Sequence, residues 1–207
     1  MAEKTDIKNE VLHTIYTRRA VRKFKKDPVN RSVIEQIIDA GRMAPSAMNK
    51  QPWHFHVLTD PKLIKIFSAS IMDAGKFGML KAGLKEAVNA ILHPGTYHLK
   101  DGLDFFSAKD PIFHGAPVVI FISSPKSSEW APLDVGMCAQ NMMLAAKALG
   151  LDTCPVGLAR FIEKSELYEK LGIPAADHVN LAVILGYADE TPVLHERKRD
   201  NLTYIEM

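Results

Sequence analysis

Cysteine is scarce in this chain of 207 residues, and the two that occur, Cys138 and Cys154, do not form a C-x-x-C pair. They cannot make a disulfide framework or a cysteine-rich metal site, so we expect both to be buried as small hydrophobic residues. No run approaches the ~20 apolar residues of a membrane helix, and the N-terminus lacks the apolar core of a signal peptide. We therefore expect a soluble, cytoplasmic protein.

An excess of charge of either sign is also missing. The 26 Lys and Arg residues nearly balance the 24 Asp and Glu residues, which leaves a formal net charge of +2. That charge is too small to imply a global attraction to nucleic acid or membrane, so any basic site must be local. The length suffices for one substantial core, and we expect a single domain over residues 1–207.

The common catalytic motifs are absent from the sequence. There is no G-x-G-x-x-G after a strand, no Walker A pattern, no G-x-S-x-G and no H-E-x-x-H. His54 and His56 share a strand face, but no third ligand stands at a recognisable spacing, so we expect no metal site. The sequence thus favours neither a dinucleotide-binding fold of the common type nor a common hydrolase.

Helical and strand patterns alternate along the chain, which predicts helices packed around a central sheet in three layers. In the second helix, Ser32 and Glu35 form an expected capping box. From about residue 74 to residue 115 the pattern weakens, and we expect an insertion or lid there. The expected elements are an opening helix with Val11, Leu12 and Ile15 on one face, a helix from Ser32 to about Ala44, strands at 53–58, 118–122 and 181–185, and helices from Pro61 and from about Asp134 to Gly150.

Two segments near the N-terminus stand out. Residues 18–24 concentrate arginine and lysine around Val21 and Phe24, whereas residues 44–55 offer small and amide side chains in a sharp connection. A basic run is most often a solvated face, and a stretch of Pro, Ser and Asn is most often a turn. However, the apolar residues anchor the first segment, and a guanidinium binds phosphate through two parallel hydrogen bonds.

Taken together and in order, several segments resemble the FMN-dependent nitroreductase family. They are the arginine segment, the capped helix, residues 44–55, the helix from Asp134, the loop Pro155 to Gly157, the strand ending at Tyr187, and the basic tail at 197–199. The resemblance implies an α+β fold with a central, mainly antiparallel sheet flanked by helices. It also implies an intertwined homodimer with two FMN sites at its interface.

Site residues follow from the same resemblance, position by position. It places Arg18 at the phosphate and Arg22 beside the pyrimidine edge of the flavin, where Arg22 would tune the redox chemistry. Many members have Ser at the position of Ala20, which we therefore expect to make a packing or backbone contact. The other implied contacts are Arg19, the segment Pro45, Ser46, Ala47 and Asn49 from the second subunit, the loop Pro155, Val156 and Gly157 near flavin N5, and the tail residues Arg197 and Arg199.

Within the tail, the choice among Arg197, Lys198 and Arg199 stays open, because adjacent residues of an extended segment point in opposite directions. The resemblance implies hydride transfer from NADH or NADPH to FMN, and then reduction of a nitroaromatic, a quinone or an activated alkene. The flavin performs this chemistry, so no catalytic side chain is expected. Alternatives are a flavin-binding redox sensor without turnover and a specialised member such as a dehalogenase or a flavin-fragmenting enzyme.

Overall fold

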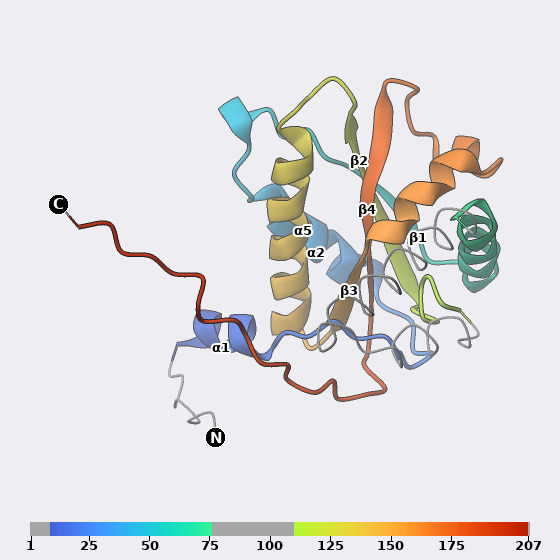
Figure 1. Cartoon of the computed structure of the whole chain (residues 1–207). Coiled ribbons are helices and arrows are strands. Elements are labelled where there is room, and N and C mark those ends of the chain that lie inside the picture. The colour runs from blue at the N-terminus through green and yellow to red at the C-terminus, as the bar shows by residue number, and fades with distance from the viewer. Residues whose placement is uncertain (1–8, 76–109, 207) are drawn as a thin grey trace, which may run out of the picture.

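A four-stranded antiparallel sheet forms the centre of the computed structural model, which describes residues 9–75 and 110–206 (Figure 1). The strand order is β1-β2-β4-β3, and every neighbouring pair is antiparallel. The strands are β1 (His54–Leu58), β2 (Val118–Pro125), β3 (Asp152–Val156) and β4 (Asp177–Gly186). The helices are α1 (Glu10–Thr17), α2 (Arg31–Arg42), α5 (Ala131–Ala148), the 3-10 turns η1 (Ala47–Asn49), η2 (Gly157–Lys164) and η3 (Tyr168–Leu171), and residues 61–75.

The two central strands divide their apolar side chains between two cores. In β2, Ile120 and Ile122 face α2 and α5, whereas Val119 and Phe121 face the helix at 61–75 and η2. Both faces of these strands are therefore buried, which explains why their sequences read as continuous apolar runs. The expected strands at 118–122 and 181–185 are confirmed, as is the mixed fold of helices and an antiparallel sheet.

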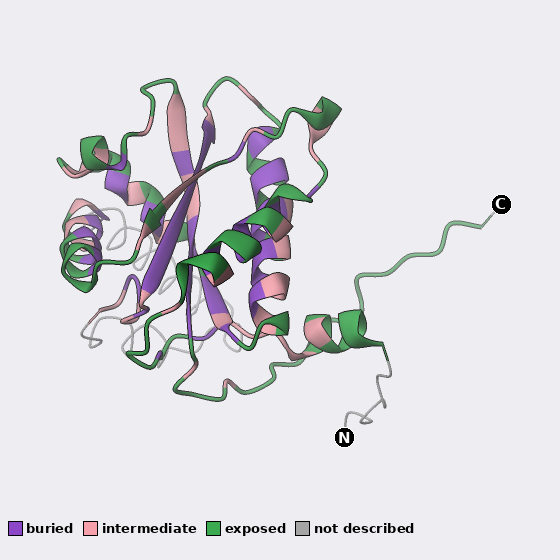
Figure 2. Cartoon of the chain, turned by 180° about the vertical axis from the view of Figure 1, so that it is seen from behind, coloured by how far each residue is buried: buried purple, intermediate pink, exposed green. Residues whose placement is uncertain are grey.

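One face of the sheet is covered by α5, which is in turn covered by α2 (Figure 2). The two helices pack closely at Gly41, where an added Cβ would lie 2.6 Å from Cγ of Met142 and 3.1 Å from Sγ of Cys138. Cys138 and Cys154 are both buried and unpaired, as expected. The long helix α5 thus lies between the sheet and α2, with little freedom to shift.

The helix starts differ from those expected. The capping box at Ser32 is wrong, because α2 begins at Arg31, and it is the carbonyl of Asn30 that accepts from the N–H groups of Val33 and Ile34. Likewise, α5 begins at Ala131 rather than near Asp134. A proline in the first turn of a helix costs no hydrogen bond, so Pro132 is compatible with this earlier start.

The expected loop at 155–157 is also partly wrong, because Pro155 and Val156 belong to β3. Proline is disfavoured inside a sheet, since it cannot donate to a neighbouring strand. It is tolerated here because β3 lies at the edge of the sheet, and Pro155 pairs with Val183 of β4 on one side only.

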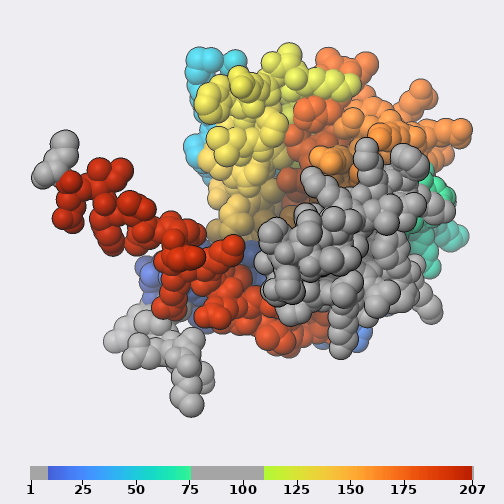
Figure 3. Space-filling model, viewed as in Figure 1, coloured from blue at the N-terminus to red at the C-terminus, as the bar shows by residue number. Residues whose placement is uncertain are grey.

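The first helix and the C-terminal tail stand apart from both cores (Figures 1 and 3). No residue of α1 is buried, and Val11, Leu12 and Ile15 are 64%, 46% and 44% exposed. The strand-like residues of the tail, Tyr204 among them, are exposed and form no strand. Both segments therefore present apolar side chains that the described residues of one chain leave exposed.

Of the expected lid, residues 76–109 lie outside the described residues. Its C-terminal end, residues 110–115, is held by the Asp110 carboxylate. That group accepts from the N–H groups of Phe113 (2.9 Å) and Gly115 (3.0 Å) and from the hydroxyl of Ser68 on the helix at 61–75. This end of the segment is thus a fixed turn that leads into β2.

Gly186, the last residue of β4, allows a contact that holds the arginine segment. A Cβ at this position would lie 2.6 Å from Cδ of Pro117 and 3.2 Å from Cδ1 of Phe24. The proline ring is stiff, so we expect Gly186→Ala to lower the free energy of unfolding by about 1–3 kcal/mol. Urea unfolding measures this.

Pro117→Ala removes the ring carbon that the new methyl group would meet, so it provides the control. The double variant should lose less stability than the sum of the two single variants. Strict additivity would mean that the contact with Pro117 does not limit residue 186.

Candidate functional site

The arginine segment lies along the outer edge of β3. Ala20 forms an isolated parallel bridge with Thr153, and the N–H of Val21 donates to the carbonyl of Thr153 at 3.0 Å. The side chains of Val21 and Phe24 are buried, as expected, and fix the directions in which the intervening cations point. Residues 18–22 and the Pro155 region thus form one locus, although more than 130 positions separate them in the sequence.

Two cations of this locus are close enough to repel each other. Arg18 is half-buried, and its pKa is lowered first by loss of solvent and then by the positive charges of Arg19 and Arg197. Among the described residues Arg18 has no ion-pair partner. The positive charge of the tail residue Arg197 therefore acts on Arg18, and a bound anion would stabilise this concentration of positive charge.

Arg19 already has protein partners. Its Nη1 atom lies 2.7 Å from the carbonyl oxygens of both Tyr16 and Arg18, at the C-terminus of α1. The last carbonyl groups of a helix lack partners within the helix, so a cation at this end stabilises it. Part of the Arg19 guanidinium thus has a structural role, and its contact with a cofactor stays a prediction.

The predicted loop near flavin N5 divides into exposed and buried residues. Pro155 and Gly157 are exposed, whereas the side chain of Val156 is buried in the core, so only the backbone of Val156 remains to contact a ligand. The neighbouring Cys154 is buried too, and burial raises the pKa of its thiol although Arg22 and Arg18 act in the opposite direction. Both arginines therefore lie close to β3.

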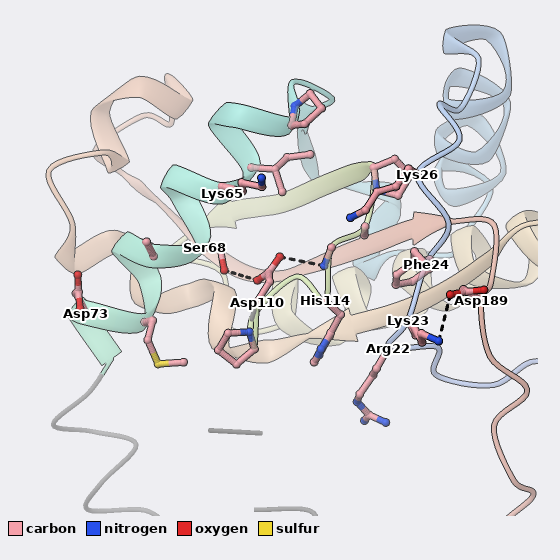
Figure 4. Close-up of a pocket in the computed structure, with 18 residues that line it drawn as sticks. Arg22, Lys23, Phe24, Lys26, Lys65, Ser68, Asp73, Asp110, His114 and Asp189 are labelled. Atoms are coloured by element: carbon pink, nitrogen blue, oxygen red, sulfur yellow. Dashed lines mark hydrogen bonds and ion pairs between the residues drawn. The ribbon is translucent and has the colours of Figure 1, made fainter. Parts of the chain in front are cut away.

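His114 is a residue that the sequence did not single out. It lies beside Arg22 (Figure 4), and burial lowers its pKa first, followed by the positive charge of Arg22. His114 and Gly115 both adopt left-handed backbone angles, with φ of 54° and 69°. Such strain in a non-glycine residue is common at functional sites. The helix and strand pattern is weak before residue 115, so the sequence offered no reason to select this histidine.

The predicted segment Pro45 to Asn49 forms a strained turn at the N-terminal end of α5. Met48, Asn49 and Gln51 have positive φ angles of 51°, 53° and 46°. The Asp134 carboxylate accepts from the N–H of Ala47, which lies 3.2 Å from Oδ1 and 3.3 Å from Oδ2. This bond ties the turn to α5.

Hydrogen bonds within the turn use its side-chain acceptors, and among the described residues the side-chain donors of Ser46 and Asn49 have no partner. Oγ of Ser46 accepts from the N–H of Gln51 at 2.9 Å, and Oδ1 of Asn49 accepts from Nε2 of Gln51 at 3.1 Å. The Ser46 hydroxyl and the Asn49 Nδ2 group can therefore donate to a ligand. The N–H of Ala47, by contrast, is already bound.

The turn and the arginine segment lie at opposite ends of α5 (Figure 1). Ala47 is bound to the N-terminal end of the helix, and the bridge between Ala20 and Thr153 forms just after its C-terminal end. Ala47 is bonded at Asp134, and the fourteen residue steps from there to Ala148 at 1.5 Å each separate the two groups by about 21 Å along the helix. One chain therefore does not bring the two predicted halves of the site together.

A cavity of about 1180 Å³ lies next to the arginine segment (Figure 4). Arg22 and His114 line one part of it, Lys26 lines it just after the arginine segment, and Lys65 lines it from the helix at 61–75, together with the carboxylates of Asp73, Asp110 and Asp189. Within residues 9–75 and 110–206, neither lysine has an ion-pair partner. The volume is sufficient for a small organic ligand.

Of the two strand histidines, His56 uses both ring nitrogens in hydrogen bonds within the protein. Nδ1 of His56 lies 2.9 Å from the carbonyl of Leu171, so Nδ1 carries the proton and Nε2 accepts from the hydroxyl of Ser123. Val57 of the same strand is 40% exposed. Within the described residues no three metal-binding side chains gather.

None of the helices in the described part of the chain is long and apolar enough to cross a membrane.

Comparison with known proteins identifies the family of the chain. A family model described as "Nitroreductase family" matches residues 15–187. The chain is 33% identical over 206 residues to a 4-nitrobenzoate reductase of Pseudomonas putida, which covers 87% of this chain and 86% of that protein.

Two solved structures share the fold. A nitroreductase with bound FMN from Desulfitobacterium hafniense has a TM-score of 0.77 at 24% identity, covering 96% of this chain and 99% of its own. The FMN-dependent nitroreductase NfnB from Mycobacterium smegmatis, in complex with NADPH, has a TM-score of 0.71 at 22% identity, covering 96% and 98%. From the family model and the match to the Pseudomonas enzyme together, it follows that the chain belongs to the nitroreductase family.

Proposed function

We propose that this chain is an FMN-dependent oxidoreductase that takes electrons from NADH or NADPH and reduces nitroaromatic compounds. The observation that carries the proposal is the half-buried Arg18 next to the bridge between Ala20 and Thr153, which has no ion-pair partner among the described residues and is exposed to the positive charge of Arg197. FMN carries a phosphate with close to two negative charges, and this anion would replace the repulsion between the two guanidinium groups with two favourable contacts. The structural neighbours support the choice, since one has bound FMN and another bound NADPH.

The residues present fit the rest of the cofactor as well. Arg22 projects a permanent cation from the same segment, where it would stabilise the negative charge that reduction develops at the pyrimidine edge. The exposed backbone at Pro155 and Gly157 leaves room for a flat ring beside β3. FMN when bound supplies the hydride chemistry, accepting a hydride from the nicotinamide and passing reducing equivalents to the acceptor in a second half-reaction.

We further propose that the protein works as a homodimer with two sites. Among the described residues the Ser46 hydroxyl and the Asn49 amide have no acceptor, and about 21 Å along α5 separates their turn from the arginine segment of the same chain. A second copy would bring its turn to the arginine segment of the first. The exposed apolar residues of α1 and the tail favour the same association, since a large apolar surface seldom stays uncovered.

For the acceptor we propose a nitroaromatic that carries a carboxylate. Lys26 and Lys65 have no ion-pair partner in the described part of the chain, and both line the cavity that begins at Arg22. The relative from Pseudomonas putida is a 4-nitrobenzoate reductase, an enzyme named for such an acceptor. In the first step, NAD(P)H, one proton and the nitroarene would give NAD(P)⁺, the nitrosoarene and water.

The cofactor and the assembly are tested together on the purified protein. We expect two flavin absorption bands, release of one FMN per chain on denaturation, and a molecular mass of twice 23.0 kDa by light scattering. NADH or NADPH should bleach the visible band, and 4-nitrobenzoate should restore it. A dimer that binds FMN but turns over neither nicotinamide nor any acceptor would favour the redox-sensor alternative instead.

Arg18→Ala should weaken FMN binding by about 1.5–3 kcal/mol, the range of a hydrogen bond to a charged group. Titration of FMN-depleted protein measures the dissociation constant. Arg31→Ala is the control, because Arg31 is exposed, pairs with Glu35 and lies outside the locus. If the Arg18 and Arg31 variants bound FMN equally well, Arg18 would not be a phosphate ligand.

The acceptor is tested with a charged and an uncharged substrate. In Lys26→Met and Lys65→Met, we expect KM for 4-nitrobenzoate to rise about five- to tenfold, as the loss of about 1 kcal/mol of attraction implies. KM for nitrobenzene should stay the same. Lys62→Met, on the same helix but outside the cavity lining, serves as the control. Equal changes for both acceptors would rule out a carboxylate subsite at these lysines.

A further inference from the structure

Asp134 is a buried carboxylate with few partners. Its side chain is 2% exposed, in the first turn of α5, and among the described residues its only hydrogen-bond partner is the N–H of Ala47. Burying an ionised carboxylate costs free energy unless charges or hydrogen bonds compensate, and no cation pairs with it in the described part of the chain. The first turn of a helix favours a negative charge but does not require one. The contact with Ala47 therefore points to a role in the turn.

That turn needs an external constraint. Three residues within four positions have positive φ angles, and none of them is glycine. Each costs about 1 kcal/mol or more, and such conformations persist only where the surroundings enforce them. The remaining polar contacts, from Ser46 to Gln51 and from Asn49 to Gln51, lie within the turn itself. The bond from Asp134 is the one that fixes the turn against α5.

The same constraint determines where the free donors point. Since the oxygen atoms of Ser46 and Asn49 are used inside the turn, the Ser46 hydroxyl and the Asn49 amide are left to donate outward. A change in the path of the backbone at Ala47 would redirect both groups at once. Asp134 itself need not touch a ligand to affect its binding.

We propose that Asp134 is a positioning residue of the flavin site, and that it acts across the dimer. Through Ala47 it holds the turn of its own chain in the shape that contacts the FMN bound by the arginines of the other copy. This inference rests on the proposed function. It adds Asp134 to the residues that affect FMN binding, although most of the length of α5 separates Asp134 from the arginines of its own chain.

The first experiment compares three variants by titration of FMN-depleted protein with FMN. Asp134→Ala removes the acceptor, and we expect its dissociation constant for FMN to rise about tenfold. Asp134→Asn keeps one oxygen that can accept from Ala47, so the rise should be threefold or less. Cys138→Ala is the matched control, one turn further along the same buried face of α5. It should lower the unfolding midpoint and leave FMN affinity unchanged.

If Asp134 served only the stability of α5, FMN affinity would fall in step with the unfolding midpoint of the FMN-depleted protein. In a plot of FMN affinity against unfolding midpoint, the Cys138 variant would then lie on the same line as the two Asp134 variants. That outcome would overturn the proposal. An Asp134→Ala chain that binds FMN as tightly as the original protein would overturn it as well.

The second experiment tests action across the dimer. Asp134→Ala and Arg18→Ala chains carrying different affinity tags are unfolded, mixed and refolded, and the hybrid dimers are isolated through both tags. In each hybrid, one site combines the intact Arg18 of one chain with the intact turn of the other, and the second site carries both defects. We expect one tightly bound FMN per hybrid dimer. If Asp134 acted on the site of its own chain, no intact site would form and tight binding would be absent.

A separate outcome distinguishes failure of the proposed function. If Arg18→Ala homodimers bind FMN normally, the phosphate assignment is wrong, whereas the titrations of the Asp134 variants still decide the role of Asp134. If the protein binds no FMN under any condition, the proposed function fails, and the positioning role fails with it.

Discussion

The packing of α5 between the sheet and α2 is the constraint on which the other features depend. Its buried side chains, such as Val135 and Met142, fill the core on one face of β2 and β4, and Gly41 lets α2 approach closely. At one end the helix is bonded to the turn at Ala47, and at the other it leads into β3. A straight, buried helix of fixed length therefore sets the distance between the two groups of polar residues in each chain.

Two buried or half-buried carboxylates shape the loops in the same manner. Asp110 accepts from the backbone of a turn in which His114 has a positive φ angle, and Asp134 accepts from the backbone of the turn that contains Met48. Neither aspartate forms an ion pair within the described residues. Each instead uses its side-chain oxygens to hold a strained backbone through hydrogen bonds from its N–H groups. The polar groups near these turns are thus placed by backbone geometry.

The uncovered apolar surface has a consistent location. It comprises α1, where Tyr16 is 61% exposed, and the tail, where Ile205 is 91% exposed. These segments lie near each other in Figure 1, at the C-terminal end of α5, which is also the end near the arginine segment. The tail then leads away from the body (Figure 3). A second copy that covered them would remove this surface from water and would also bring in the missing turn. Association and completion of the site would then be the same event.

Local sequence patterns identified the elements that are buried on both sides or on one regular face. The apolar runs of β2 and β4 and the periodicity of α5 depend only on which residues avoid water, and that information is present within a short window. The expected secondary structure was wrong where a residue's conformation depends on a strand that lies far away in the sequence. Pro155 lies in a strand because β3 is at the edge of the sheet, where a residue without an N–H breaks no hydrogen bond to a further strand.

The sequence by itself thus determined the fold class, the anchored arginines and, through family resemblance, the residues expected to contact FMN. Only the tertiary structure decided how these residues are grouped. It bonded Asp134 to Ala47, placed His114 near Arg22, and brought the charge of Arg197 to act on Arg18, although the members of each pair are distant along the chain. It also separated the turn from the arginines by most of the length of α5. The physical reason is that spacing along the sequence encodes burial, whereas distances in space depend on the path of the whole chain between rigid elements.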